Sequence, residues 1–262
     1  MHNLLVSFSL TTAILATPSV CLGQVNVTDR QVAEVRAKLV IATRYMTLTW
    51  KEFFADEKST PPFPRVVPYR TSLRSGCGVL ESESAQFCYV DNTVSYDEVF
   101  LTALTRLAAV SLGTDGDYAA VVALAHEVGH AIRYAQQKQR AEKRCRLNEH
   151  PGRTAEGALG LCIVSNKDFW ETGYDLESQA DCYAGAITKH FKDEHLLDPG
   201  DFEEGQFILG VVADQTRWAP TPAIKRIIYS HGNAPDRQEH FEVGYRRGVG
   251  ACIISTDLEN AP

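Results

Sequence analysis

Two histidines and a glutamate stand in the segment His126-Glu127-Val128-Gly129-His130, with the histidines four positions apart. In a helix, residues four apart lie on one face, so both imidazoles can point toward the same metal ion. Histidine nitrogens are typical ligands of zinc. Glu127, beside the first histidine, can take a proton from the water that a bound metal activates. The spacing therefore predicts a site for one zinc ion, held by His126 and His130, with Glu127 as the catalytic residue.

A zinc site of this kind needs a third protein ligand, and two acidic residues further along the chain are candidates. Glu177 and Asp181 are four positions apart within 176–187, a segment with many apolar residues. Acidic side chains in such a helix need a polar partner, and a metal site provides one. We expect Glu177 to be the third ligand and Asp181 to accept the N–H of one ligand histidine. The rival assignment makes Asp181 the ligand.

The helix that carries the two histidines is predicted from about residue 117, with Asp117 as its cap, to about residue 140. Residues 119–125, directly before His126, are all apolar, which is typical of a buried helix. Gly129 costs a helix roughly 1 kcal/mol relative to alanine. We therefore expect a packing reason for Gly129, such as the close approach of another backbone.

Other segments show the patterns of helices and of one β-hairpin. Thr28 with Gln31, and Asp201 with Glu204, form capping-box patterns that start helices. Prolines between residues 61 and 68 end the first helix and predict an extended connection. The predicted helices span residues 28–53, 97–112, 117–140, 175–191, 201–218 and 235–247. This content predicts a mostly helical α+β fold with a small early sheet, in a single domain over residues 24–262.

The hairpin is predicted at residues 86–96. Two runs rich in aromatic and β-branched residues flank the polar pair Asp91-Asn92 there, which is the usual hairpin pattern. One strand of this hairpin could offer an open edge along which a peptide lies extended.

The cysteine count suggests disulfides. The chain has 7 cysteines, and an even number remains once Cys21 is removed with the predicted leader. An even number of cysteines in an exported chain suggests a disulfide framework, whereas buried free thiols would fit a cytosolic protein better. The predicted pairs, the first two from proximity in the sequence and the third by elimination, are Cys77–Cys88, Cys145–Cys162 and Cys182–Cys252.

Residues 1–23 carry no Lys, Arg, Asp or Glu. The apolar run from Leu4 to Ala16 is too short and too polar for a good membrane-spanning helix. It is typical of the core of a signal peptide that is cleaved after Gly23. We therefore expect an exported protein, secreted or periplasmic, with no stable membrane insertion after cleavage. An N-terminal anchor is the alternative, and Val20 argues against a lipid anchor on Cys21.

The overall charge limits the classes of partner. Lys and Arg total 26 against 33 Asp and Glu, which gives a net charge of −7. An acidic chain with no long basic stripe is a poor candidate for binding nucleic acid or anionic membranes. With 44% hydrophobic and 23% charged residues, the chain is not disordered as its main state. We expect a peptide or protein substrate and no nucleic acid.

A series of short motifs follows one order through roughly residues 76–252. They are Cys77-Gly78, Gln86-Phe-Cys-Tyr-Val-Asp, Val94-Ser-Tyr-Asp, Gly116-Asp-Tyr-Ala, Ala125-His-Glu-Val-Gly-His, Leu176-Glu-Ser-Gln-Ala-Asp-Cys-Tyr-Ala-Gly and Ser230-His-Gly-Asn-Ala-Pro-Asp-Arg. In this order they resemble the neutral zinc metallopeptidase family, within the thermolysin-like gluzincin group. The resemblance implies a zincin-like fold, with His126, His130 and Glu177 on zinc and Glu127 as the catalyst.

The implied reaction is hydrolysis of a peptide bond. Zinc would polarise the scissile carbonyl while Glu127 delivers hydroxide and then passes the proton to the leaving amine. The oxyanion that forms needs a second donor. His231, in the Ser-His-Gly turn before the last helix, is the candidate, with Tyr183 and Arg237 as alternatives.

Functions from three classes fit the sequence. The first is an exported zinc endopeptidase. The second is a non-catalytic zinc-binding factor that acts in binding or maturation, and the presence of Glu127 argues against it because zinc binding alone does not need that residue. The third is a structural domain held by disulfides without a metal, which leaves Glu177 and Asp181 unexplained.

Overall fold

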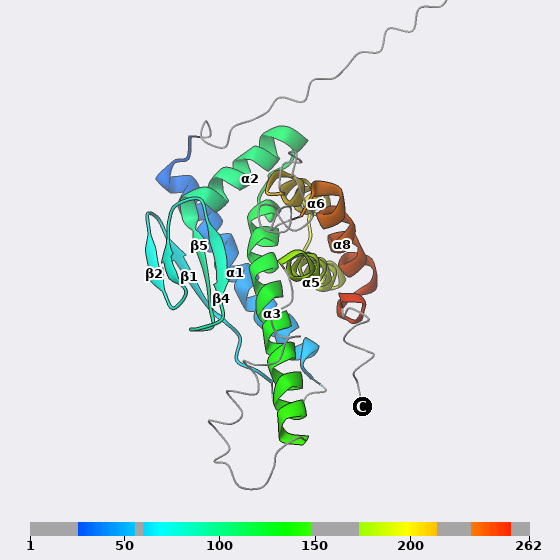
Figure 1. The fold of residues 1–262 in the computed structure, drawn as a ribbon. Helices are drawn as coiled ribbons and strands as arrows, with labels where there is room; N and C mark the ends of the chain where they lie inside the picture. The colour runs from blue at the N-terminus through cyan, green and yellow to red at the C-terminus, as the bar shows by residue number, and fades with distance from the viewer. Residues whose placement is uncertain (1–25, 56–59, 148–172, 214–231, 253–262) are drawn as a thin grey trace, which may run out of the picture.

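The chain folds as helices around one long central helix, with a small sheet at one side (Figure 1). The structure is a computed structural model, and it describes residues 26–55, 60–147, 173–213 and 232–252. Its elements are α1 (Asp29–Phe53), β1 (Arg65–Tyr69), β2 (Leu73–Ser75), β3 (Gly78–Leu80), β4 (Ala85–Cys88), β5 (Thr93–Asp97), α2 (Glu98–Leu112), α3 (Tyr118–Leu147), α5 (Gly173–Asp193), α6 (Asp201–Val211), α8 (Ala234–Arg247) and the short helix η3 (Val249–Cys252). The central helix is α3. It packs against α1 and the sheet on one side and against α5 and α6 on the other.

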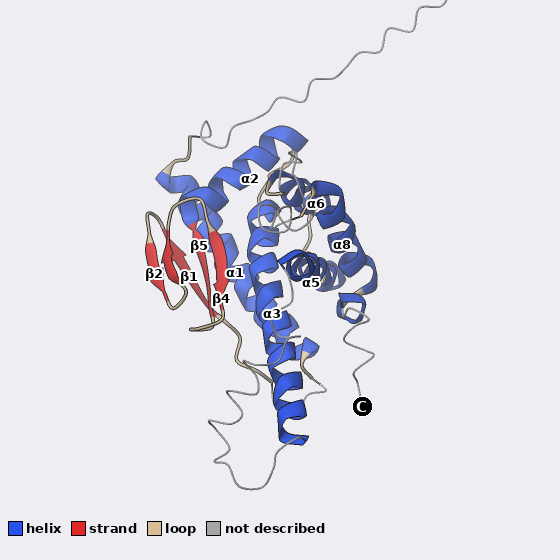
Figure 2. Cartoon of the chain, viewed as in Figure 1, coloured by secondary structure: helices blue, strands red, loops and turns tan. Residues whose placement is uncertain are grey.

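The predicted class, mostly helical α+β with a small sheet, is confirmed (Figure 2). The main sheet has the order β1-β5-β4, with β5 parallel to β1 and antiparallel to β4, and β2 with β3 forms a separate antiparallel pair. The predicted hairpin is therefore present as β4 and β5. Where β1 lies, the prolines between residues 61 and 68 predicted only an extended connection, and Pro68 has no N–H to donate to a sheet. Pro68 is tolerated there since β1 is at the edge of the main sheet.

The core lies between α1, α2, α3 and α5. Val32, Leu39, Met46 and Trp50 recur along α1, as predicted, and each is at most 2% exposed. Residues 119–122 of α3 are at most 1% exposed, so the start of this helix is fixed by packing on several sides. Among the described helices, none combines the length and the apolar character needed to cross a membrane.

The capping box predicted at the start of α6 is wrong. The helix begins at Asp201, but its N-cap is Gly200 and no side chain caps it. The carboxylate of Asp201 instead accepts the N–H of Asp198. The described helix ends at Val211, short of the predicted end at 218, and residues 214–231 lie outside the described residues.

Glu204 of α6 serves the start of a different helix. Its carboxylate accepts the N–H of Gly116 at 2.9 Å and the N–H of Tyr118 at 2.8 Å. A negative charge is favourable at a helix N-terminus, so α6 holds the first turn of α3. Asp117, which the sequence predicted as the cap of α3, forms an ion pair with Lys38 of α1.

Two of the three predicted disulfides are present. Cys77–Cys88 joins the start of β3 to the end of β4, and Cys182–Cys252 joins α5 to η3. The predicted partner of Cys145, Cys162, lies outside the described residues, so that pair stays a prediction.

Gly129 allows α3 and α5 to cross closely. A Cβ added at position 129 would lie 2.6 Å from the carbonyl oxygen of Ala180 and 2.9 Å from its Cα. Real Cβ atoms do not approach other atoms this closely, and backbone atoms of a buried helix cannot rotate away. The packing reason that the sequence required for Gly129 is therefore confirmed.

Replacing Gly129 with alanine should lower the free energy of unfolding by about 2 kcal/mol, because overpacking outweighs the helix propensity gained. Urea unfolding followed by circular dichroism measures the change. Gly210→Ala in α6 is the matched control, since the close contact of its new Cβ would be with the end of the Gln238 side chain and not with backbone atoms. Equal stability of Gly129→Ala and wild type would contradict the close crossing.

Candidate metal centre

Two neighbouring helices carry the predicted zinc residues. His126, Glu127 and His130 lie on α3, and Glu177 and Asp181 lie on α5. The sequence correctly predicted the helix positions of both sets. The two helices lie side by side (Figure 1). Their close crossing brings the histidines of α3 within contact distance of the carboxylates of α5.

Three ligand atoms converge at this crossing. The Nε2 atom of His126 is 3.1 Å from Nε2 of His130 and 3.1 Å from Oε2 of Glu177. The Nε2 atom of His130 is 3.5 Å from Oε1 of Glu177. His126, His130 and Glu177 thus form a group whose ligand atoms all lie within 4.8 Å of one another.

Asp181 determines which nitrogen of His126 carries the proton. Its Oδ1 atom is 2.7 Å from Nδ1 of His126, and its two oxygens also accept hydrogen bonds from Arg237 at 2.7 and 2.8 Å. Burial disfavours the charged form of Asp181, but Arg237 and His126 outweigh this and lower its pKa. The ionised carboxylate can only accept, so Nδ1 carries the proton and Nε2 directs a lone pair toward Glu177 and His130.

The converging groups fit a zinc ion. With both histidines neutral and protonated on Nδ1, their Nε2 atoms and the carboxylate of Glu177 all offer lone pairs to the same point. With His126 neutral, Oε2 of Glu177 is buried without a hydrogen-bond donor, which is costly without a cation. Two imidazoles and a carboxylate are a typical ligand set of a catalytic zinc site. Metal binding by these residues stays a prediction.

Without a metal, a proton on His126 provides the positive charge that the carboxylates of Glu177 and Asp181 need. Burial lowers the pKa of His126, but the charge and the hydrogen bond of Asp181 outweigh burial and raise it to about 10. Burial raises the pKa of Glu177, but its contacts with His126 and His130 have the larger effect and lower it. At neutral pH the empty site therefore holds an imidazolium beside two carboxylates.

Zinc affinity should rise with pH, because the metal must displace the proton on His126. Below the His126 pKa of about 10, the dissociation constant should fall by up to about tenfold for each unit of rising pH. Competition with a chelator of known affinity, at about pH 6, 7 and 8, measures this dependence. The same dissociation constant at all three values would contradict it.

Glu127 lies at the wall of a cleft beside the ligand group. Its Oε2 atom accepts the backbone N–H of Phe87 in β4 at 2.8 Å. The cleft has a volume of about 500 Å³ and is lined by β4, α3 and the start of α5, including Ser84, Ala85 and Glu177. This places the predicted catalytic carboxylate between the edge of the sheet and the ligand group.

Glu127 and His126 also line a second cavity of about 400 Å³. It shares Ser84 and Ala85 with the cleft, so the end of the sheet borders both spaces. Its remaining lining is mainly apolar: Phe100, Leu104, Ala123, Ile208, Leu209 and Val212, with Glu83 and Arg237. Glu127 therefore lies between a mixed polar and aromatic cleft and an apolar cavity.

The structure describes two of the three candidates for the oxyanion donor, Tyr183 and Arg237. His231 lies outside the described residues. The hydroxyl of Tyr183 donates to Gln136 at 2.5 Å, and the side chain is 1% exposed. Arg237 borders the apolar cavity, but its guanidinium is hydrogen-bonded to Asp181. From the sequence, Arg237 was an alternative candidate for the oxyanion donor. Its contact with Asp181 was not predicted.

Relatives of this chain come from several bacteria. It is 28% identical over 204 residues to the uncharacterized protein YpfJ of Escherichia coli, which covers 76% of this chain and 64% of the relative. It is 26% identical over 226 residues to the uncharacterized protein Rv2575 of Mycobacterium tuberculosis, which covers 82% of this chain and 68% of the relative. The chain thus spans less than two-thirds of the length of the Escherichia coli protein.

No solved structure matches the chain. A family model does: the one described as "Putative neutral zinc metallopeptidase" matches residues 15–253. The match includes every residue of the ligand group and Glu127. The chain therefore belongs to this family of neutral zinc metallopeptidases.

Proposed function

We propose that this chain is a zinc-dependent peptidase that binds one zinc ion through His126, His130 and Glu177. The observation that carries the proposal is the convergence of three lone-pair donors within 4.8 Å, with Glu127 next to them at the wall of a cleft. The family to which the chain belongs supports zinc and hydrolysis. Zinc at such a site supplies Lewis acidity, which activates water and polarises a carbonyl group.

Glu127 acts as the general base and then as the general acid. Its carboxylate takes a proton from the attacking water and delivers it to the nitrogen of the leaving amine. The hydrogen bond from the Phe87 N–H to Oε2 holds the carboxylate at the wall of the cleft. The other oxygen, Oε1, is then the atom that handles the proton.

The substrate is a peptide or protein segment that lies extended along β4. The N–H of Asp97 donates to the carbonyl of Ser84, and hydrogen-bonded residues alternate along an antiparallel pair. Ala85 and Phe87 therefore direct their backbone groups away from β5, toward the cleft. The N–H and carbonyl of Ala85 and the carbonyl of Phe87 can pair with an extended peptide, whereas the N–H of Phe87 donates to Glu127. The neighbouring apolar cavity, which Glu127 also lines, would accept an apolar side chain of that peptide.

The proposed fold and location follow from the same assignment. A zincin-like fold is proposed because the two histidines and the third ligand come from two adjacent helices beside a small sheet. Disulfides form and persist in oxidising compartments, so Cys77–Cys88 and Cys182–Cys252 support an exported protein. Neither nucleic acid nor a membrane is proposed as a partner.

The test is the metal content of the purified mature chain together with a screen of peptide substrates. We expect one zinc per chain and hydrolysis that is lost on treatment with a chelator. His126→Ala should lose the zinc, whereas His240→Ala on α8, outside the ligand group, should keep it. Absence of metal after zinc has been supplied would overturn the proposal, and zinc without any hydrolysis would favour a non-catalytic zinc-binding factor.

A further inference from the structure

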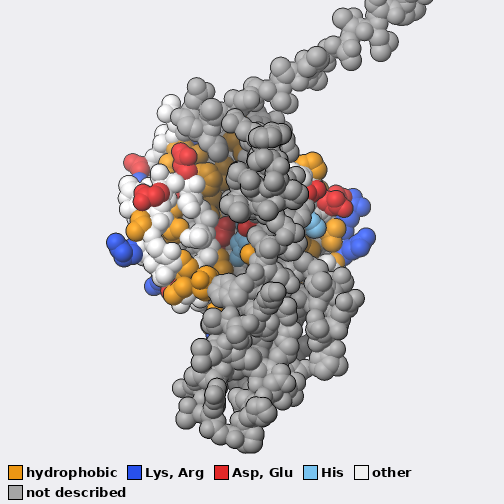
Figure 3. Space-filling view, viewed as in Figure 1, with side chains coloured by type: hydrophobic (Ala, Val, Ile, Leu, Met, Phe, Trp, Pro, Cys, Tyr) orange, Lys and Arg blue, Asp and Glu red, His pale blue; other side chains and the backbone are white. Residues whose placement is uncertain are grey.

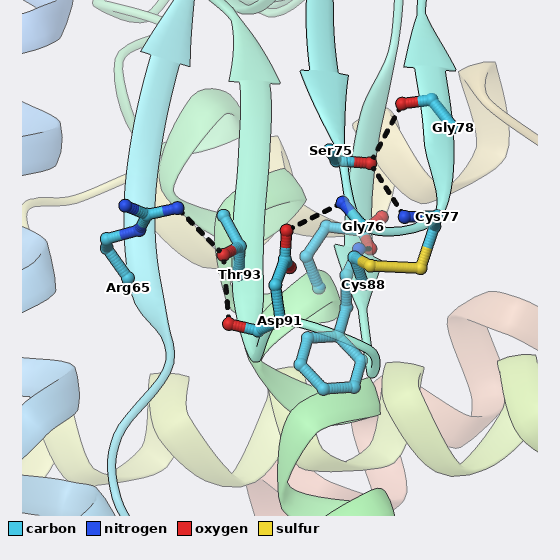
Figure 4. Close-up of a disulfide and its surroundings, with 10 residues drawn as sticks. Arg65, Ser75, Gly76, Cys77, Gly78, Cys88, Asp91 and Thr93 are labelled. Atoms are coloured by element: carbon cyan, nitrogen blue, oxygen red, sulfur yellow. Dashed lines mark hydrogen bonds between the residues drawn. A yellow bond between two sulfur atoms is a disulfide. The ribbon is translucent and has the colours of Figure 1, made fainter.

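The end of β4 is tied to the neighbouring strand pair by a disulfide (Figure 4). Cys88 is the last residue of β4, and Cys77 lies directly before β3. The N–H of Gly76 also donates to Asp91 at 2.7 Å, so one covalent bond and one hydrogen bond join the two turns. Both bonds lie at the same end of the sheet.

The disulfide lies one residue along the chain from Phe87, whose N–H holds the carboxylate of Glu127. Phe87 precedes Cys88, and its N–H donates to Oε2 of Glu127 at 2.8 Å. The ring of Tyr134 in α3 lies 5.8 Å from the ring of Phe87 and 5.9 Å from the ring of Tyr89. The residues on both sides of Cys88 thus form part of the wall of the cleft.

Within the described residues, the disulfide is the one covalent cross-link at this end of β4; its other restraints are the pairing with β5, the hydrogen bonds of Phe87 and Asp91, and the ring contacts with Tyr134. The strand has 4 residues and pairs on one side only, with β5. Beyond it, Tyr89 and Val90 are 46% and 60% exposed, and hydrophobic side chains are visible on the surface at this end of the sheet (Figure 3). If the covalent bond were opened, this end of the strand would be held by non-covalent contacts alone within the described residues.

The two described disulfides differ in their access to solvent. Cys182 and Cys252 are each 3% exposed. Cys77 is exposed, whereas Cys88 is 2% exposed. A reductant has to reach one sulfur of a disulfide to attack it. Cys77–Cys88 is therefore the one of these two that a dissolved thiol can open without unfolding of the core.

We propose that the Cys77–Cys88 disulfide positions β4 against Glu127, and that its reduction by a dithiol converts the enzyme to a low-activity form that keeps its zinc. This inference rests on the proposed function. The zinc residues come from α3 and α5, which the disulfide does not join, so opening it leaves the ligand group intact. Opening the disulfide instead lets Phe87 move away from its position beside Glu127 at the wall of the cleft.

Two steps of thiol–disulfide exchange open the bond. A thiolate of the dithiol attacks the sulfur of Cys77, forms a mixed disulfide and releases Cys88 as a thiolate, which takes up a proton. The second thiol of the reductant then attacks the mixed disulfide and releases Cys77. The protein gains two electrons and two protons, and the dithiol becomes a cyclic disulfide. Oxidation of the two cysteines reverses the change.

The main test compares zinc-loaded wild type with the double variant Cys77→Ala/Cys88→Ala. We expect kcat/KM of the variant to fall about tenfold or more, with one zinc per chain retained and a melting curve that still shows a folded protein at the assay temperature. Reduction of the wild type with a phosphine, tris(2-carboxyethyl)phosphine, should give the same loss, and reoxidation should restore activity. The double variant should not respond to the phosphine.

The matched control is Ser75→Ala in the same turn. Ser75 accepts the N–H of Cys77 and donates to the carbonyl of Gly78, so this change removes local hydrogen bonds and leaves the covalent tie. Its kcat/KM should stay within about twofold of wild type, as expected for a surface change. Full activity of the double variant, or loss of its zinc, would overturn the inference.

A readout without substrate separates this inference from the proposed function. The amide of Phe87 should exchange with solvent at least about tenfold faster in the double variant, because its bond to Glu127 is no longer maintained. Buried amides of α3 should not change. If the wild type hydrolyses no peptide, the proposed function fails, and unchanged exchange at Phe87 would separately overturn the positioning role of the disulfide.

Discussion

Replacing Glu127 with glutamine should leave one zinc per chain and lower kcat by about 10²–10⁴-fold, the usual contribution of a general base. Glutamine has nearly the same shape, and its carbonyl oxygen can still accept the N–H of Phe87, as Oε2 of Glu127 does at 2.8 Å. It cannot take a proton from water at neutral pH. The change therefore removes proton transfer and keeps the geometry of the cleft wall.

Metal analysis and peptide hydrolysis on the same preparation decide the result. Glu83→Gln is a matched control, because Glu83 lines the neighbouring apolar cavity and has no proposed part in proton transfer. Its kcat should change little. Normal turnover by Glu127→Gln would show that another residue acts as the base, and loss of zinc would show that Glu127 helps to hold the metal.

The structure limits where the base could otherwise come from. Asp181 is 0% exposed and is hydrogen-bonded to both His126 and Arg237, so it has no access to water in the cleft. Glu177 already has its carboxylate in the ligand group. Among the acidic residues that line the cleft, Glu127 is then the one with an oxygen free for proton transfer.

Features that depend on neighbouring residues could be predicted from the sequence. The capping box of Thr28 and Gln31 is present as predicted, because both partners lie within one helical turn. The placement of His126 and His130 on one face follows from their spacing alone. Gly129 could also be interpreted from the sequence, because a glycine destabilises a helix and therefore indicated the close approach of another backbone. The structure identifies that backbone as Ala180 of α5.

Features that depend on distant backbone groups could not be predicted. Glu204 holds the start of α3 through the N–H groups of Gly116 and Tyr118, which are 88 and 86 positions away. The N–H of Phe87 reaches Glu127 across 40 positions. Every residue type other than proline has a backbone N–H, so no side-chain pattern in the sequence marks these contacts.

The position of His126 depends on a charge pair that the sequence did not reveal. Arg237 of α8 is 3% exposed and Asp181 of α5 is 0% exposed, and the guanidinium contacts both carboxylate oxygens. Burial disfavours the charge of Arg237, but Asp181 outweighs this and raises its pKa. α8 thus supports the ligand group although it contributes no residue to it.

Replacing Arg237 with glutamine should lower the free energy of unfolding by about 3–5 kcal/mol, because the buried carboxylate of Asp181 loses its guanidinium partner. Zinc affinity should fall by about 10–100-fold, as it does when the partner of a ligand histidine is disturbed. Because Glu127 is intact, activity should return when zinc is added in excess at a temperature where the variant is folded. Chelator competition and urea unfolding measure the two effects.

Two further variants separate the lost charge from other causes. Arg246→Gln on the same helix breaks an exposed pair with Glu242, whose side chains are 72% and 40% exposed, and should cost no more than about 1 kcal/mol. Adding Asp181→Asn to Arg237→Gln should recover part of the lost stability, because the unpaired charge is gone. Zinc affinity should stay low in the double variant, since an amide that accepts the Nδ1–H of His126 carries no charge to strengthen that ligand. A double variant less stable than Arg237→Gln would show that Arg237 acts by packing and not through its charge.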